Sequence, residues 1–240
     1  MARHGRITIA APLVLAIENA SQYGSVAVVG DGGCLAESSL VSGETHSKRL
    51  LLSIDRLLAD TGLDWPGLAA IAVSIGPGSF TGIRIGLATA KGLAMAAGKP
   101  LLGISTLDGL ARQLAVQPLP VRPVLDARKK ELFTACYRLD ASGRQQRMEE
   151  YRVLAPEKLA AEICEPTLLV GDGLSVYGAL FRERLGENCR TAPAELFFPR
   201  AAAIGVLAVE RITGGDHPGA SDVLPLYVRA SDAELSLGRR

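Results

Sequence analysis

The stretch GPGSFTGIRIG, at residues 76–86, is the most informative part of this 240-residue sequence. An apolar run at residues 68–75 precedes it and a helical pattern at residues 82–97 follows, so the glycines lie where a strand passes into a helix. Glycine lets the backbone turn sharply and approach its neighbours closely. Exposed N–H groups at the start of a helix can hold an anion. Taken alone, the stretch fits either a phosphate-binding loop or a tight structural turn.

Residue identities separate these two readings. A phosphate-binding P-loop has the pattern GxxxxGK[ST], in which lysine reaches the phosphates and Ser or Thr reaches Mg²⁺. Here Ile83 follows Gly82, and no lysine is placed for phosphate. We therefore predict a structural loop rather than a phosphate site. Its residues are Gly76, Pro77, Gly78, Ser79, Phe80, Thr81, Gly82 and Arg84.

Two neighbouring helices predicted in the first half carry much apolar surface. Small residues recur about every four positions along residues 82–97, which lets another helix approach closely. Residues 47–60 place leucine and isoleucine on one helical face, with Leu52 off that face. This surface fits either an interface with another chain or packing on the chain's own sheet. The interface residues that we predict are His46, Leu50, Leu51, Ile54, Leu58, Ile83, Leu87, Ala90 and Ala94.

The same order of elements is expected twice along the chain. The first half predicts three strands, a helix, a strand and a helix, at residues 13–20, 25–29, 34–41, 47–60, 68–75 and 82–97. The second half predicts the same series, at residues 121–127, 131–138, 148–154, 156–163, 167–170 and 176–185. Duplicated β-β-β-α-β-α lobes are the pattern of the actin-like (ASKHA, RNase H-like) α/β fold.

The prolines at residues 118 and 120 suggest a boundary between two lobes. We expect a first lobe at residues 1–116 and a second lobe at residues 117–200. Residues 201–240 are expected to form a C-terminal helix that returns to the first lobe, followed by a tail that is extended or loop-like at residues 224–228. A short helix capped by Ser105 or Thr106 is expected before the boundary.

Acidic residues near the ends of the two first strands, Glu18 and Asp126, are candidate metal ligands. Mg²⁺ usually takes carboxylates together with substrate phosphates. A lone carboxylate at a strand end is more often held by loop N–H groups, so we expect no metal at either position. The charged turn DARKKE at residues 126–131 fits a solvated turn or a contact site for a partner or a phosphate.

Composition excludes several classes of protein. The three histidines, His4, His46 and His217, form no HxxxH or HExxH pair, and the four cysteines form no CxxC pair. The formal net charge of +1 gives no support for a domain that binds nucleic acid phosphates by itself. No apolar run is long enough for a membrane helix. We expect no cofactor and no metal.

With these residues in view, the chain resembles the TsaB (YeaZ) family over nearly its whole length. The segments that carry the resemblance are LAIENA (15–20), ETHSKRLLLSIDRLL (44–58), GPGSFTGIRIGLATAKGLA (76–94), ISTLDGLA (104–111), LDARKKELFTACY (125–137) and PLYVRASDAE (225–234). Two features depart from the family pattern. Glu18-Asn19 stands where the family usually has Asp-Thr, which weakens any metal role, and residues 1–12 form a longer extension than the family needs.

The resemblance implies a non-catalytic subunit with the fold of its paralogue TsaD, but without TsaD's metal-binding histidine motif. Such a subunit is required with TsaD and the ATPase TsaE for threonylcarbamoyl transfer to N6 of adenosine 37 in tRNAs reading ANN codons. The resemblance further implies a heterodimer with TsaD through the first-lobe helices and a homodimer when alone. It also implies tRNA contact only through the complex, a cytoplasmic location and no membrane.

Two other hypotheses remain open at this point. The chain could be an active enzyme of the actin-like class, a small-molecule kinase or carbamoyl transferase, which would need a nucleotide bound between the lobes. It could also be a metallopeptidase, as the older glycoprotease description of the family suggests, although the sequence shows no set of metal ligands.

Overall fold

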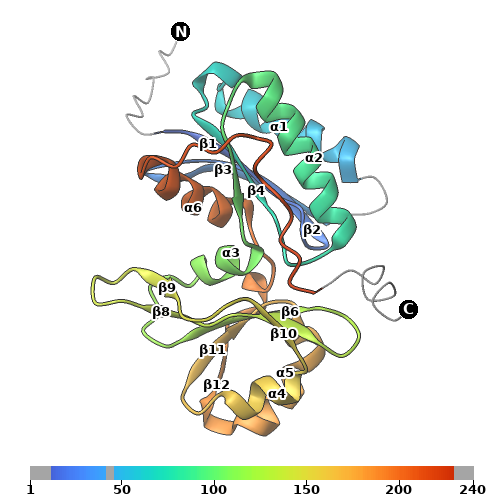
Figure 1. Cartoon of the computed structure of the whole chain (residues 1–240), viewed down its shortest axis with the longest axis vertical. Coiled ribbons are helices and arrows are strands. Elements are labelled where there is room, and N and C mark those ends of the chain that lie inside the picture. The colour runs from blue at the N-terminus through green and yellow to red at the C-terminus, as the bar shows by residue number, and fades with distance from the viewer. Residues whose placement is uncertain (1–11, 42–45, 230–240) are drawn as a thin grey trace.

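The computed structural model describes residues 12–41 and 46–229, and within these ranges the side chains of residues 40, 41 and 46–48 are not described. The extension predicted at the N-terminus therefore lies almost wholly outside the described residues. Two lobes are stacked along the long axis of the molecule (Figure 1), each built on its own β-sheet.

The first lobe is a five-stranded sheet with helices on both faces. Its strands are β1 (Val14–Glu18), β2 (Tyr23–Gly30), β3 (Gly33–Val41), β4 (Ala70–Ser74) and β5 (Leu101–Ile104), in the order β3-β2-β1-β4-β5. The first three strands form the predicted antiparallel meander, and β4 and β5 add in parallel. Every residue of β1 and β4 is buried, as expected for strands covered on both faces.

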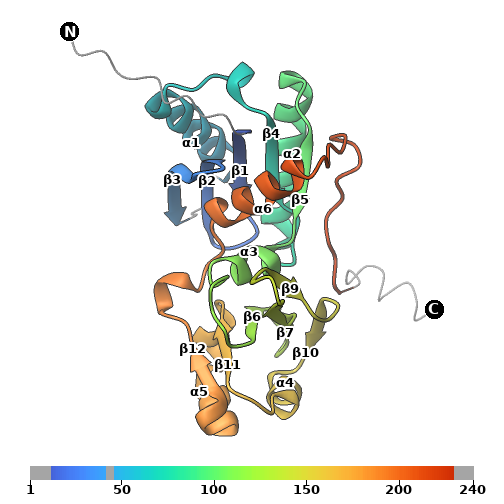
Figure 2. The same cartoon turned by 90° about the vertical axis from the view of Figure 1, so that its left-hand side faces the viewer.

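Three helices cover this sheet. Helices α1 (His46–Thr61) and α2 (Phe80–Ala97) pack side by side on one face, while α6 (Ala201–Thr213) packs on the other (Figure 2). A short 3₁₀ turn, η1 (Trp65–Gly67), precedes β4. None of the helices in the described ranges is long and apolar enough to cross a membrane.

Helix α3 (Thr106–Arg112) lies between the lobes, and Ser105 caps its start by accepting a hydrogen bond from the Leu107 N–H at 3.2 Å. The second lobe's strands are β6 (Val121–Asp126), β7 (Leu132–Thr134), β8 (Tyr137–Leu139), β9 (Gln145–Arg147), β10 (Arg152–Leu154), β11 (Thr167–Val170) and β12 (Cys189–Thr191). The main path of the sheet is β10-β7-β6-β11-β12, and β8 pairs with β6 and β9. Helices α4 (Pro156–Glu162) and α5 (Gly173–Leu185) pack together with this sheet.

The second lobe differs from the prediction at its middle strands. The single strand predicted at residues 131–138 is divided into β7 and β8, although both pair with β6 in one continuous register. Pro123 lies opposite the division, and proline has no N–H to donate to the ladder. The strand predicted at residues 148–154 is shorter, as β10, and β9 precedes it. Strand β12, a short polar segment, was not predicted.

The chain returns to both lobes after α6. Residues 223–229, here called the C-terminal strap, contain no helix or strand, in line with the extended tail predicted there. Val223 is buried in the first lobe, and the Leu226 N–H donates to the Ile75 carbonyl at 2.8 Å. Arg229 then donates to the Ala127 carbonyl of the second lobe at 3.1 Å. The strap, red in Figure 1, therefore joins the two lobes.

Candidate functional site

The loop between β4 and α2 packs directly on the turn between β1 and β2. The Ser79 N–H donates to the Ala20 carbonyl at 2.7 Å, and the Asn19 side-chain amide donates to the Gly82 carbonyl at 2.8 Å. A Cβ added at Gly78 would lie 2.3 Å from the Ala20 oxygen, and one at Gly82 would lie 2.1 Å from the Asn19 oxygen. These glycines are needed because two backbone segments touch, so no room is left there for a phosphate.

Several polar backbone groups of this loop already have partners inside the chain. Ser79 caps α2 by accepting a hydrogen bond from the Gly82 N–H on its hydroxyl at 3.2 Å, and its carbonyl accepts from the Ile83 N–H at 2.9 Å. The Gly76 carbonyl accepts from the Thr106 N–H at 2.9 Å, and the following Gly76–Pro77 peptide bond is cis. The remaining residues predicted for the loop are exposed: Phe80, Thr81 and Arg84.

Glu18, at the end of β1, is fully buried rather than open to a ligand. One carboxylate oxygen accepts the Ala20 N–H at 2.7 Å, and the other has no hydrogen-bond partner among the described residues. Burial raises the pKa of Glu18 to about 7, because the charged form loses its hydration. A fully enclosed carboxyl leaves no space for a Mg²⁺ ion and the water molecules that it usually keeps.

The second lobe repeats this arrangement. Gly171 and Gly173 follow β11, and a Cβ added at either would lie 2.3 or 2.7 Å from the Val124 oxygen of β6. The Asp126 N–H donates to the Asp172 carboxylate at 2.9 Å, and burial raises the pKa of Asp172. Each half thus closes its glycine-rich loop against its own first strand or the turn that directly follows it. Within residues 12–41 and 46–229, no group of three His, Cys, Asp or Glu side chains is placed to hold a metal ion.

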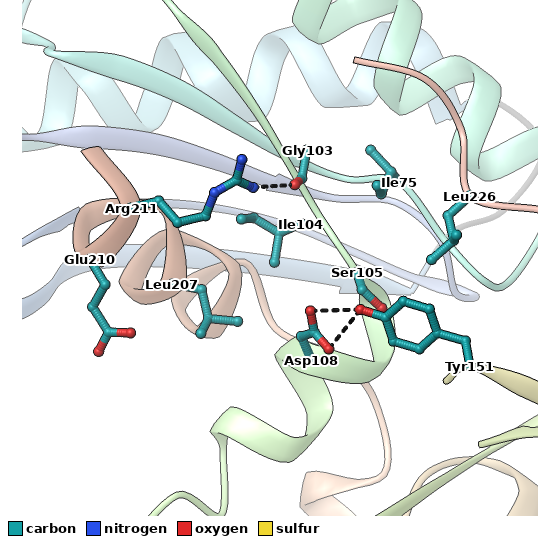
Figure 3. Close-up of a pocket in the computed structure, with 10 residues that line it drawn as sticks. All are labelled: Ile75, Gly103, Ile104, Ser105, Asp108, Tyr151, Leu207, Glu210, Arg211 and Leu226. Atoms are coloured by element: carbon teal, nitrogen blue, oxygen red, sulfur yellow. Dashed lines mark hydrogen bonds between the residues drawn. The ribbon is translucent and has the colours of Figure 1, made fainter. Parts of the chain in front are cut away.

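A pocket of about 460 Å³ lies where the two lobes meet (Figure 3). Its polar side chains are engaged with neighbours: Asp108 accepts hydrogen bonds from the Tyr137 and Tyr151 hydroxyls at 2.6 and 2.9 Å. Arg211 donates to the Gly103 carbonyl at 2.7 Å. A ligand site needs polar groups that converge on the empty space. Here Asp108 instead ties α3 to the second lobe, and Arg211 is held within the first lobe.

The structure corrects the predicted interface. Seven of its residues lie in the chain's own core, each no more than 7% exposed, because the apolar side of both helices faces the sheet: Leu50, Ile54, Leu58, Ile83, Leu87, Ala90 and Ala94. Leu51, in contrast, is 45% exposed. His46 begins α1, but its side chain lies outside the described residues.

The solvent side of α2 also carries a stripe without charged residues, which the sequence reasoning missed. Five residues at helical spacing form this α2 outer face: Thr81, Ile85, Ala88, Gly92 and Met95. Met95 is 75% exposed, and a Cβ added at Gly92 would meet no atom within 4 Å. Glycine inside a helix costs about 1 kcal/mol of stability relative to alanine. Packing within the chain does not require glycine at position 92, because the space around it is open.

Comparison with known proteins gives the family. Residues 38–236 match the family described as TsaD, tRNA N6-adenosine threonylcarbamoyltransferase. The tRNA threonylcarbamoyladenosine biosynthesis protein TsaB of Escherichia coli (strain K12) is 30% identical over 90% of this chain and 94% of its own length. The chain belongs to the TsaB (YeaZ) family. The TsaB of Bacillus subtilis (strain 168) is 26% identical over 92% of this chain and 96% of its own length.

Solved structures confirm the predicted actin-like fold. YeaZ from Pseudomonas aeruginosa is similar with a TM-score of 0.77 and 29% identity, covering 90% of this chain and 99% of that chain. An activator of 2-hydroxyisocaproyl-CoA dehydratase from Clostridium difficile, solved with bound ADPNP, has a TM-score of 0.52 at 12% identity, with 90% and 99% covered. This second likeness shows the fold alone.

Proposed function

We propose that the chain is a non-catalytic partner subunit in tRNA threonylcarbamoyladenosine biosynthesis. In this proposal it binds TsaD, acts with TsaE, and is required for threonylcarbamoyl transfer to N6 of adenosine 37 in tRNAs reading ANN codons. The observation that carries the proposal is the closed loop at residues 76–82, where Gly78 and Gly82 bring the backbone against Ala20 and Asn19. A subunit whose loops are closed in this way has no phosphate cradle of its own. The names of the relatives supply the pathway.

The α2 outer face is the proposed docking surface for TsaD. Helix α1 lies beside α2 and adds Leu51 and Leu52, which are 45% and 54% exposed. Small side chains on α2 let a partner helix approach closely, and Gly92 leaves open space at the middle of the face. Lys91 lies at its edge, where it can contribute a polar contact. The same face would hold a second copy when the chain is alone, and the whole assembly would work in the cytoplasm with its tRNA.

The substitution Gly92→Trp tests this surface. The indole would fill the space that a partner helix needs, while the open position leaves the chain's own fold unstrained. We expect the affinity for TsaD to fall at least about thirtyfold, the effect of losing a contact of about 2 kcal/mol. The matched control is Ala179→Trp, at an exposed position on α5 in the other lobe. Wild-type affinity of Gly92→Trp for TsaD would place the interface elsewhere.

An active enzyme of the actin-like class would bind a nucleotide between the lobes. Titration calorimetry of the isolated chain with Mg-ATP separates this hypothesis from the proposal. We expect no stoichiometric heat, because the N–H groups of the loop at Ser79 and Gly82 have partners within the chain. Tight one-to-one binding would favour the enzyme instead.

A further inference from the structure

Two half-exposed aromatic rings meet an arginine at the start of α2. Phe80 is 46% exposed and Tyr227, from the C-terminal strap, is 44% exposed. Their rings stack with centroids 5.6 Å apart and planes inclined by 29°. The Arg84 guanidinium lies 3.7 Å from the Phe80 ring centroid and donates to the Tyr227 hydroxyl at 3.1 Å. The cluster thus joins flat π surfaces to a fixed positive charge.

The turn between β6 and β7 presents three basic residues on an unusual backbone. Arg128, Lys129 and Lys130 are all exposed and have φ angles of 60°, 53° and 62°. Residues with a Cβ rarely adopt this left-handed conformation, and three in succession persist only when neighbours hold them. The Asp126 carboxylate accepts the Arg128 N–H at 2.9 Å, and the Glu131 N–H donates to the Arg128 carbonyl at 3.0 Å. Such backbone strain is concentrated at ligand-binding sites.

The C-terminal strap brings the aromatic cluster and this basic turn together. Arg229 donates to the carbonyl of Ala127, the residue directly before the turn, at 3.1 Å, and also pairs with Glu131. Tyr227 is two residues from Arg229, so the strap links the aromatic pair of the first lobe to the basic turn of the second lobe. The aromatic pair, Arg84 and the turn at residues 128–130 are here called the strap surface. Its charge is positive although the whole chain carries only +1.

We propose that the strap surface binds a stretch of unpaired RNA. Aromatic rings and arginine planes stack on exposed bases, and lysine and arginine side chains neutralise the phosphates that join them. An acidic peptide would use the charges of Arg128 and Lys130 but not the paired rings of Phe80 and Tyr227. The inference rests on the proposed function in taking tRNA as the natural RNA, and it goes further in giving this chain a direct contact with it.

The test is fluorescence anisotropy of the full chain with a labelled single-stranded RNA at low ionic strength, and with the same RNA paired to its complement. We expect tighter binding of the single strand. The double variant Arg128→Glu, Lys130→Glu should weaken binding at least about tenfold. It should also reduce the slope of the logarithm of the association constant against the logarithm of the salt concentration by about 1.4. The variant removes two phosphate contacts, and each contact with a single strand contributes about 0.7 to the slope. Tyr227→Ala should weaken binding about five- to 150-fold with an unchanged slope.

The matched control is Arg182→Glu, Arg184→Glu on α5, which makes the same change of charge at exposed positions. Should the double variant at the turn fail to fold in a thermal scan, Lys130→Glu alone replaces it, with an expected slope change of about 0.7.

Four results would overturn the proposal: no RNA binding by the wild type, equal weakening by the control, full competition by ATP, or an unchanged affinity in the variants at the turn and at Tyr227. Affinity for TsaD is measured on the same samples. If variants at the turn bind TsaD more weakly but bind RNA with unchanged affinity, the turn is a protein contact instead. If the chain does not bind RNA, the proposal that TsaD docks on the α2 outer face still stands.

Discussion

Replacing Glu18 with glutamine should make the chain more stable in a strongly pH-dependent way. Burial raises the pKa of this carboxyl from its ordinary value of 4.5 to about 7. Between these values the folded chain binds more protons than the unfolded chain, so the free energy of unfolding falls as pH rises. A shift of about 2.5 pKa units corresponds to about 3 kcal/mol. This stabilisation of the wild type is fully present below pH 4.5 and lost above pH 7.

Glu18→Gln removes the charge and keeps an oxygen that can accept the Ala20 N–H. In urea unfolding from pH 4 to 8, the free energy of unfolding of the variant should therefore rise relative to that of the wild type, by up to about 3 kcal/mol at the highest pH. Asp140→Asn serves as the control: hydrogen bonds from Ser142 and Arg144 hold the pKa of Asp140 below its usual value of 3.8, so its contribution changes only at lower pH and its difference from wild type should stay nearly flat from pH 4 to 8. A difference between Glu18→Gln and wild type that is flat across this range would refute the buried, neutral carboxyl.

Three further substitutions test the packing. Gly82→Ala places a methyl group 2.1 Å from the Asn19 oxygen. Thermal unfolding should therefore show that the free energy of unfolding falls by about 3 kcal/mol. An unchanged Tm would contradict the close contact. Gly92→Ala should stabilise the free chain by up to about 1 kcal/mol in the same assay, whereas destabilisation would mean that the position is not open. Arg229→Ala removes the second-lobe anchor of the strap. The Leu226 amide, bonded to the first lobe, should then exchange its hydrogen faster, and unchanged protection would show that the anchor is dispensable.

The periodic parts of the sequence predicted the fold well, because burial on two faces leaves a clear pattern. The strand at β1 and the leucine face of α1 are examples, and Ser105 was one of two residues expected to cap α3. The division between β7 and β8 was missed, since Pro123 acts on a strand across the sheet rather than on its own neighbours. Strand β12 was missed because a three-residue polar segment has no periodicity.

The candidate site was predicted less well. Residue identities in the loop at residues 76–82 argued against phosphate chemistry, and the structure shows what the glycines do instead: they allow backbone contact with Ala20 and Asn19. The sequence could not tell the two sides of α2 apart, because Ala90 in the core and Ala88 on the surface are the same residue type. The strap contacts of Tyr227 and Arg229 join residues that lie far apart in the sequence, and no local sequence pattern encodes such contacts.

The most direct test of the central claim is a reconstituted assay of threonylcarbamoyladenosine formation with purified TsaD, TsaE, tRNA, ATP and threonylcarbamoyl-adenylate as the donor. It is run without this chain, with the wild type, with Gly92→Trp and with the control Ala179→Trp. We predict product with the wild type and the control, and almost none without the chain or with Gly92→Trp. Equal product with and without the chain would contradict a required subunit, and full activity of Gly92→Trp would contradict docking through the α2 outer face.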